Sequence, residues 1–298
     1  MKSLTVFTPT YNRGYILPEL YKSLCDQTCK DFVWIVVDDG STDNTQELLY
    51  KWQDEKIIDM LFCYQDNGGK MRAHNRGVEM SETELFVCVD SDDKLASPTS
   101  IEDNLKFWEL QKSQNFSGMI SYWKTSGVIS YKDISHRSSQ FPRDLYCSPL
   151  WKIYEKGFRG DTTLMFRTEV LREFPFPEIE GEKFITEAYV YDQIDQKYQL
   201  ILYPYYTQKC EYKNDGYTYN INNVKIHNPM GYMMYYNQAI RIGKGKKWRN
   251  ISEYISMSLF ARRWDAVLKC ETPFLALLLF PLGIYKNLKL RYSIWRKS

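Results

Sequence analysis

The sequence predicts an α/β fold in which a mostly parallel sheet carries helices on both faces and is followed by a C-terminal helical extension. Three observations support this prediction. Apolar runs typical of buried strands alternate with segments of helical periodicity through the first hundred residues. Each of these runs ends in a polar loop. The 298 residues also suffice for one large domain with an elaboration, or for two small domains.

Four strands and three helices are expected in the first ninety residues. The strands are residues 4–7, 32–37, 60–64 and 85–89, and apolar residues recur at helical spacing within 16–24, 48–52 and 71–80. Strands that alternate with helices at this interval form parallel sheets. The four following loops should therefore share the carboxyl edge of the sheet, which is where α/β sheets bind ligands.

Three carboxylates follow the fourth strand within four positions: Asp90, Asp92 and Asp93. Like charges this close repel one another and raise one another's pKa values unless a cation lies among them. Hard oxygen ligands suit Mg²⁺ or Mn²⁺. The alternative is an acidic turn that merely closes a strand.

The second part of the sheet domain is expected between residues 97 and 225. A helix should begin near Ser97 with a capping box of Thr99 and Glu102 and should run to about Gln114. Strands are expected at 118–123, 163–166 and 200–203, and a helix at 188–198. Residues 124–149 are expected to form a long connection, and prolines should keep 174–177 extended. Residues 1–225 would form one domain and 226–298 a helical extension.

The C-terminal segment combines an apolar run with a basic one. Residues 274–285 are almost wholly apolar, and Lys286, Lys289, Arg291, Arg296 and Lys297 follow without an acid. The apolar run is shorter than the roughly 20 residues that span a bilayer, and Pro281 interrupts it. Such a segment (274–298) suits docking on an anionic membrane surface. The alternative is a core or dimer helix with a solvated basic tail.

Composition argues against nucleic acid as a partner, because 39 basic residues nearly balance 37 acidic ones. The seven cysteines are odd in number and contain no CxxC pair, which fits reduced thiols in a cytoplasm. The first residues lead directly into a strand pattern without an apolar signal segment. We therefore expect a cytoplasmic protein.

Three segments, taken in order, resemble the inverting family 2 glycosyltransferases of bacterial polysaccharide synthesis, which have a GT-A (Rossmann-like) fold. They are Phe7-Thr8-Pro9-Thr10-Tyr11-Asn12-Arg13, Val36-Val37-Asp38-Asp39-Gly40-Ser41-Thr42-Asp43 and Val89-Asp90-Ser91-Asp92-Asp93. The resemblance covers roughly residues 3–210. It implies that residues 1–115 hold a nucleotide-sugar, most simply a UDP-sugar, and that residues 116–225 hold a saccharide or lipid-linked saccharide acceptor.

The resemblance also implies roles for single residues. The nucleotide-sugar would be bound by Thr8, Pro9, Tyr11, Arg13, Asp39, Lys70, Arg72, Asn75, Arg76, Asp90 and Ser91. Asp39 would accept a hydrogen bond from the uracil N–H. The Mn²⁺ or Mg²⁺ cofactor would be held by Asp92, with Asp90 nearer the ribose and Asp93 able to take the metal instead. Lys70, Arg72 and Arg76 could alternatively be solvated helix charges.

Inversion by direct displacement requires a carboxylate base for the acceptor hydroxyl. In Thr186-Glu187-Ala188-Tyr189-Val190, Glu187 matches the family's base position, although Glu replaces the usual Asp and Thr replaces its acidic neighbour. Asp192 and Glu182 are the fallback candidates, and Glu187 could instead be a helix N-terminal acid. By the same analogy Asp161 would lie near the acceptor, unless it only forms a turn. His227 could complete a metal site, whereas His74 is expected to be packed or near a phosphate.

Two other classes of function remain open. A sugar-1-phosphate nucleotidyltransferase would carry a Gly-rich, Arg-containing loop after the first strand, where this chain has Thr8-Pro9-Thr10-Tyr11. A non-catalytic nucleotide-sugar or glycan-binding module would not need the acids and a base together. A nicotinamide enzyme is disfavoured, because no GxGxxG follows the first strand. The resemblance and the basic tail together suggest a cytoplasmic enzyme that is peripheral on the inner face of the cell membrane.

Overall fold

The computed structural model describes residues 2–113, 115–125, 140–210 and 220–296. The chain forms two compact units. The first, here called the sheet unit, comprises Met1–Pro175 and Val190–Tyr212, and the second, the helical unit, comprises Phe176–Tyr189 and Lys213–Ser298. The expected division at residue 225 stays a prediction.

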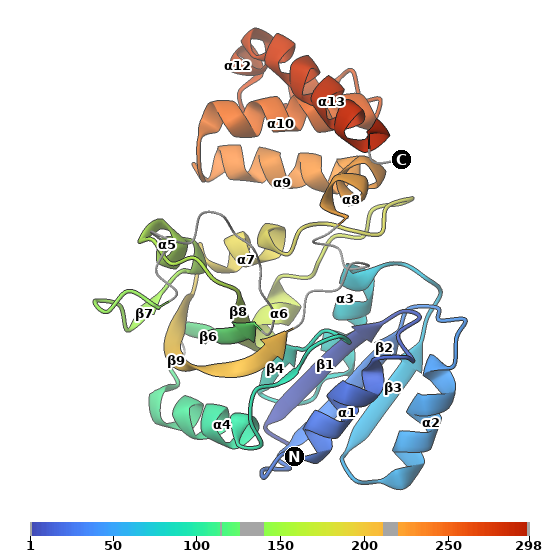
Figure 1. The fold of residues 1–298 in the computed structure, drawn as a ribbon. Helices are drawn as coiled ribbons and strands as arrows, with labels where there is room; N and C mark the ends of the chain where they lie inside the picture. The colour runs from blue at the N-terminus through green and yellow to red at the C-terminus, as the bar shows by residue number, and fades with distance from the viewer. Residues whose placement is uncertain (1, 114, 126–139, 211–219, 297–298) are drawn as a thin grey trace. The chain divides into compact units, whose positions relative to one another are not determined.

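In the described part of the sheet unit, nine strands form one sheet (Figure 1). The strands are β1 (Leu4–Thr10), β2 (Phe32–Asp38), β3 (Met60–Tyr64), β4 (Leu85–Cys88), β5 (Lys94–Leu95), β6 (Phe116–Thr125), β7 (Cys147–Ser148), β8 (Thr162–Arg167) and β9 (Gln199–Cys210). Their order is β3-β2-β1-β4-β8-β6-β9-β5, with β7 also paired to β9. Strands β1 to β4 are parallel, whereas β8 runs antiparallel to β4 and β6. The predicted mostly parallel α/β sheet is confirmed.

The helices described between residues 1 and 198 include the four long ones that the apolar spacing predicts. They are α1 (Leu17–Cys25), α2 (Thr45–Glu55), α3 (Lys70–Met80), α4 (Ser100–Gln111), α5 (Leu150–Glu155), α6 (Thr168–Glu173) and α7 (Ala188–Ile194). The predicted capping box of α4 is wrong. The Thr99 hydroxyl donates to the Asp103 carboxylate (2.7 Å) instead of capping a backbone N–H, and Glu102 pairs with Lys106. Helix α7 is also shorter than the expected 188–198.

Helices cover both faces of the sheet, as predicted. On one face, alternate strand residues such as Val6 and Trp34 pack against α1, α2 and α4 in one apolar core. On the other face, the rings of Phe7 and Phe86 lie 5.6 and 5.3 Å from His74 of α3. Helix α3 approaches β1 closely because Gly77 lacks a side chain, and a Cβ there would lie 2.3 Å from the Phe7 ring.

His74 is a packed residue in this structure. Burial, followed by the charge of Lys70, lowers the pKa of its imidazole to about 3. The ring is therefore neutral at physiological pH, and its packing against Phe7 and Phe86 agrees with the first of the two alternatives expected for it.

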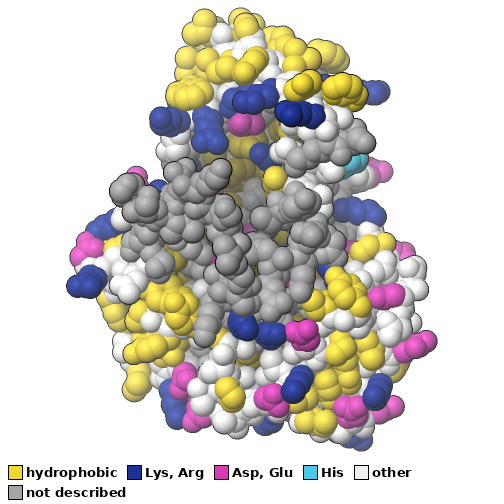
Figure 2. Space-filling view, viewed as in Figure 1, with side chains coloured by type: hydrophobic (Ala, Val, Ile, Leu, Met, Phe, Trp, Pro, Cys, Tyr) yellow, Lys and Arg dark blue, Asp and Glu magenta, His cyan; other side chains and the backbone are white. Residues whose placement is uncertain are grey.

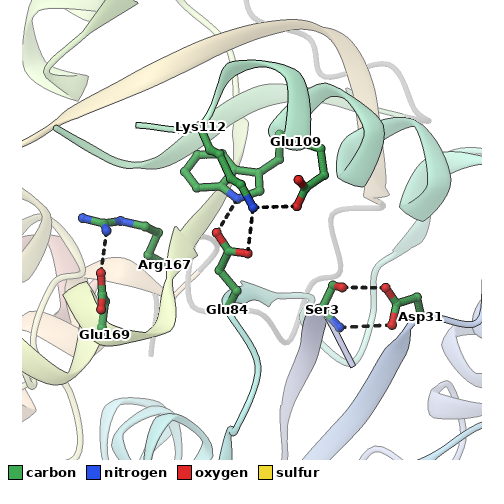
Figure 3. A network of polar contacts seen from close by, with 8 residues as sticks. Ser3, Asp31, Glu84, Glu109, Lys112, Arg167 and Glu169 are labelled. Carbon is green, nitrogen blue, oxygen red and sulfur yellow. Dashed lines mark hydrogen bonds and ion pairs between the residues drawn. The ribbon is translucent and has the colours of Figure 1, made fainter. Parts of the chain in front are cut away.

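Polar contacts fasten the amino ends of the strands (Figure 3). The Ser3 backbone N–H and hydroxyl both donate to Asp31, which joins the start of β1 to the start of β2. Before β4, Glu84 accepts a hydrogen bond from Trp108 Nε1 of α4 and pairs with Lys112. Side chains thus tie together the edge where the strands begin, and the loops at the opposite, carboxyl edge are the ones that carry the candidate site.

The helical unit contains the predicted C-terminal helices, packed around a core of its own. They are α8 (Ile221–His227), α9 (Pro229–Arg241), α10 (Lys247–Phe260), α11 (Ala266–Lys269), α12 (Pro273–Leu278) and α13 (Phe280–Trp295). Buried residues of α9 and α10, including Tyr236 and Ile255, form this core. No helix in the described part of the chain combines the length and apolar character needed to cross a bilayer.

Candidate active site

The loops after β1, β2 and β4 lie side by side at the carboxyl edge of the sheet. Thr10, the last residue of β1, pairs with Asp38, the last residue of β2, and the Asp39 N–H donates to the Thr10 carbonyl at 2.8 Å. On the other side of β1, the Val89 N–H donates to the Phe7 carbonyl at 2.8 Å. The three segments that carry the family resemblance therefore meet in space.

Asn12 braces the first of these loops against the second. Its φ of 53° is unusual for a residue with a side chain, and its amide oxygen accepts hydrogen bonds from the backbone of Thr42 (2.7 Å) and Asp43 (3.3 Å). The Asp43 carboxylate in turn accepts from the Gly14 N–H at 3.0 Å. Sequence reasoning did not assign this role to Asn12, because its partners lie thirty residues away. The bracing leaves the neighbouring Tyr11 ring 49% exposed.

Asp39 holds a third loop in place. Its Oδ1 accepts from Gln65 Nε2 (2.7 Å) and the Gly68 N–H (2.8 Å), and its Oδ2 accepts from the Gly69 N–H at 2.7 Å. A carboxylate offers about four acceptor positions, so one remains for a ligand N–H. Asp39 thus orders the loop before α3, and its expected hydrogen bond to a base stays a prediction.

The acids after β4 form a tight turn at residues 90–93, here called the acid turn. A hydrogen bond from the Asp93 N–H to the Asp90 carbonyl closes it at 2.9 Å. Lys70 Nζ lies 2.8 Å from Asp90 Oδ2, and both side chains are partly buried. Burial, followed by the charge of Asp90, raises the pKa of Asp92. Burial and the charges of Asp90 and Asp92 raise the pKa of Asp93 to about 9. The turn is an oxygen-rich cluster in which negative charge is strongly disfavoured.

A divalent cation fits the chemistry of this cluster. Across residues 2–113, 115–125, 140–210 and 220–296, no three His, Cys, Asp or Glu side chains are arranged to hold a metal ion by themselves. Mg²⁺, however, is usually bound through one or two carboxylates together with substrate phosphates. Asp92 and Asp93 supply hard oxygen ligands whose mutual repulsion a cation would relieve.

Several residues expected to bind the nucleotide have side chains whose described contacts lie away from this turn. The Thr8 hydroxyl is buried and accepts a hydrogen bond from Trp34 Nε1 at 3.0 Å. Arg76 pairs with Glu79 on the exposed face of α3. The Arg72 side chain covers Gly68, where a Cβ would lie 2.4 Å from the Arg72 Cδ. By contrast, the charges of Arg13 and Lys70 both act on Asp92 and offset part of the rise in its pKa.

The remaining nucleotide candidates differ in exposure. Asn75 is half-buried on α3, Ser91 is buried within the acid turn, and Pro9 lies in β1 opposite Val37. Their contacts with a nucleotide stay predictions.

The acceptor candidate Asp161 lies just before β8 and is exposed. Its carbonyl accepts a hydrogen bond from the Trp123 N–H at 3.2 Å, and its charge contributes to raising the pKa of Asp93. The same group of acids acts on the thiol of Cys210 at the end of β9. Burial, followed by the charge of Asp93, raises the pKa of this thiol to about 12. Asp161 thus shares an electrostatic neighbourhood with the acid turn.

The three base candidates differ in burial, and the carboxylate contacts of one of them are defined. Glu187 is half-buried directly before α7. The two oxygens of Glu182 accept hydrogen bonds from the Met230 and Gly231 N–H groups (2.7 and 2.8 Å), so this carboxylate caps the start of α9. Asp192 is buried within α7. His227, the candidate further metal ligand, lies in α8 with its Nδ1 2.8 Å from the Asn223 carbonyl.

Another residue that sequence reasoning missed is Gln208 of β9. Its buried side chain donates from Nε2 to the Cys88 carbonyl at 2.9 Å, directly before the acid turn. No sequence signal marks it, since the contact joins positions 120 residues apart.

Comparison with known sequences gives one family model, described as "Glycosyl transferase family 2", which matches residues 5–174. The chain is similar to the glycosyltransferase GlyG of Streptococcus pneumoniae (35% identical over 92 residues, 30% of each chain). It is also similar to the poly(ribitol-phosphate) β-N-acetylglucosaminyltransferase TarS of Staphylococcus aureus (32% identical over 195 residues, 64% of this chain and 33% of TarS). The chain covers 30% or less of the length of several such relatives.

Solved structures show the same fold. A crystal structure of residues 1–349 of S. aureus TarS in complex with UDP-GlcNAc matches with a TM-score of 0.61 at 16% identity, over 100% of this chain and 93% of that one. The mannosyltransferase PcManGT of Pyrobaculum calidifontis, in complex with GDP-Man and Mn²⁺, matches with a TM-score of 0.57 at 18% identity, over 96% and 86% of the two chains.

Proposed function

This chain belongs to glycosyl transferase family 2, and we propose from that premise that it is an inverting, metal-dependent glycosyltransferase that uses a UDP-sugar. The observation that carries the proposal is the acid turn at residues 90–93, which lies beside the loops after β1 and β2 at one edge of the sheet. An oxygen-rich turn at that edge is suited to a nucleoside diphosphate with its cation.

The proposed binding of the nucleotide base rests on the loops around Tyr11 and Asp39. The exposed Tyr11 ring offers a flat surface on which a base can stack, and Asp39 retains one acceptor position for an N–H. Uracil carries such an N–H. The similar TarS structure contains UDP-GlcNAc, which supports a uridine donor for this chain.

The proposed binding of the diphosphate and its cation rests on the acid turn and its basic neighbours. Asp92, with Asp93 or Asp90, would hold Mn²⁺ or Mg²⁺, and Lys70 and Arg13 would add positive charge beside it. A bound cation would stabilise the charge that develops on the departing diphosphate. The PcManGT neighbour was solved with Mn²⁺, in line with this assignment.

Transfer also requires a base for the acceptor. We assign it to Glu187, because Glu182 already caps α9 with both of its oxygens. Glu187 would take the proton of the acceptor hydroxyl as the C–O bond to the sugar forms, so that the sugar inverts in a single displacement. Asp161 would orient a saccharide or lipid-linked saccharide acceptor in residues 116–225. We place the enzyme in the cytoplasm, peripheral on the inner face of the membrane.

A panel of nucleotide-sugars tests this function. Release of nucleoside diphosphate is measured for UDP-linked and GDP-linked sugars, with Mn²⁺, with Mg²⁺ or with EDTA. We expect cation-dependent UDP release. The GDP-linked sugars test the preference for the base, because guanine also offers N–H groups that Asp39 could accept.

Two results, one from this panel and one from a separate assay with a nucleoside triphosphate, would contradict the proposal. Pyrophosphate release from a nucleoside triphosphate and a sugar 1-phosphate would identify a nucleotidyltransferase. Tight binding of nucleotide-sugars without turnover of any of them would identify a non-catalytic module.

A further inference from the structure

The C-terminal helix α13 has two faces of opposite character. On its inner face, Gly283 and Asn287 are buried against α10: a Cβ at Gly283 would lie 2.4 Å from the Ile255 side chain, and Asn287 Nδ2 donates to the Ser256 carbonyl at 2.9 Å. Lys286 adds an ion pair to Glu253 at 2.8 Å. These contacts fix the rotation of α13 about its own axis.

The outer face of α13 is aromatic and apolar. Tyr285, Leu288, Tyr292 and Trp295 recur at intervals of three and four residues, which places them on one side of the helix, roughly opposite Gly283 and Asn287. All four side chains are more than half exposed, and Trp295 reaches 73%. Most large side chains of this face point outward, and the alternative of a core or dimer helix stays a prediction.

Helix α12 continues the exposed apolar surface. Only Ala276 is buried, whereas Phe274, Leu277 and Leu278 are 90%, 68% and 74% exposed. We call these three residues, with Leu288, Tyr292 and Trp295, the C-terminal apolar face. Figure 2 shows hydrophobic side chains gathered over the α12 and α13 end of the helical unit, with Lys and Arg side chains beside them. Contiguous exposed surface of this kind marks an interaction site in soluble domains.

The charges beside the C-terminal apolar face identify its partner as anionic. The sequence has no acid after Glu271. Lys289 on α13 and Arg296, which directly follows this helix, are both exposed. Within the residues that the structure describes, no carboxylate forms an ion pair with either cation. A second copy of the same face would bring like charges together across a two-fold axis. An anionic bilayer instead offers phosphate oxygens to the cations and a headgroup layer to the Tyr and Trp rings.

We propose that the C-terminal apolar face docks the helical unit on an anionic bilayer surface. Phe274, Leu277 and Leu278 enter the boundary between headgroups and acyl chains, and Lys289 and Arg296 contact lipid phosphates. Because its inner face is packed on α10, α13 lies along the surface and does not cross it. The proposal does not depend on the sugar-transfer chemistry, since none of these residues belongs to the candidate active site.

Co-sedimentation of the full chain with vesicles tests the docking surface. The vesicles contain phosphatidylcholine alone or with about 30% phosphatidylglycerol. We expect binding to the anionic vesicles that weakens as salt is raised. The charge variant Lys289→Glu/Arg296→Glu and the apolar variant Phe274→Ser/Leu277→Ser/Leu278→Ser should each bind at least about tenfold more weakly.

Matched controls are available on the sheet unit. Leu110 of α4 is 80% exposed and Lys22 of α1 is exposed, so Leu110→Ser and Lys22→Glu change the same chemistry elsewhere and should leave binding unchanged. Thermal unfolding of each variant establishes that it is folded.

Two outcomes would overturn the proposal. One is equal sedimentation of the wild type and both surface variants, or no binding of the wild type to anionic vesicles. The other is a wild-type dimer, seen by sedimentation velocity, that the apolar variant dissociates while vesicle binding is absent throughout. That result would show that the C-terminal apolar face binds a second copy of the chain.

Discussion

Replacing Asp92 by Asn is expected to lower kcat/KM for sugar transfer by about 10²–10³-fold. The change keeps the size of the side chain and removes its charge, so it tests whether a carboxylate there holds the cation that offsets the departing diphosphate. The pKa of Asp92 responds to the charges of Arg13, in the loop after β1, and of Lys70, at the start of α3. The measurement is initial-rate kinetics with saturating Mn²⁺.

Chelation provides a second measure of the same effect. EDTA should reduce the wild type to about the level of Asp92→Asn and should change the variant little. Asp54→Asn is the matched control, because Asp54 is exposed on α2 and outside the site. Unimpaired transfer by Asp92→Asn, or by the wild type in EDTA, would show that transfer does not require a metal at Asp92.

Replacing Glu187 by Gln is expected to lower kcat by about 10²–10⁴-fold, because general-base catalysis contributes on that scale. Binding of UDP should be unaffected, since Glu187 has no assigned role toward the donor. Initial-rate kinetics and calorimetric titration of UDP measure the two effects separately.

The matched control for Glu187 lies in the same acidic segment. Glu180 is exposed, and Glu180→Gln should retain full activity. Glu182→Gln should instead lower the thermal unfolding temperature, because it weakens the cap of α9. If Asp192→Asn abolished transfer while Glu187→Gln did not, the base would have to be reassigned to Asp192.

The central strands could be predicted because each contains a mostly apolar run that is buried on both faces. Strand β1 nevertheless extends through Pro9, where a loop was expected. Beyond Phe7 it pairs only with β2, since β4 ends its register at Cys88, and proline is tolerated where one side of a strand is unpaired. Short elements such as β5 and α6 were missed because two to six residues are too few to show a period.

The candidate site likewise contains residues that could be predicted from the sequence and residues that could not. The acid turn could be located because its residues are neighbours in the sequence. The bracing by Asn12, the loop anchored on Asp39 and the contact of Gln208 with Cys88 could not, because each joins residues about thirty or more positions apart. Resemblance to a family identified Thr8 by position, whereas the packing of Trp34 turns its hydroxyl into the core.

We infer that residues 90–93 hold a cation that offsets the charge of a departing diphosphate. A crystal structure with UDP and Mn²⁺, with anomalous scattering recorded at the manganese edge, would locate that cation. We expect an anomalous peak within bonding distance of Asp92 or its neighbouring acids and of the diphosphate oxygens. Ordered UDP whose diphosphate lies away from this turn, or beside it with no anomalous peak, would overturn the inference.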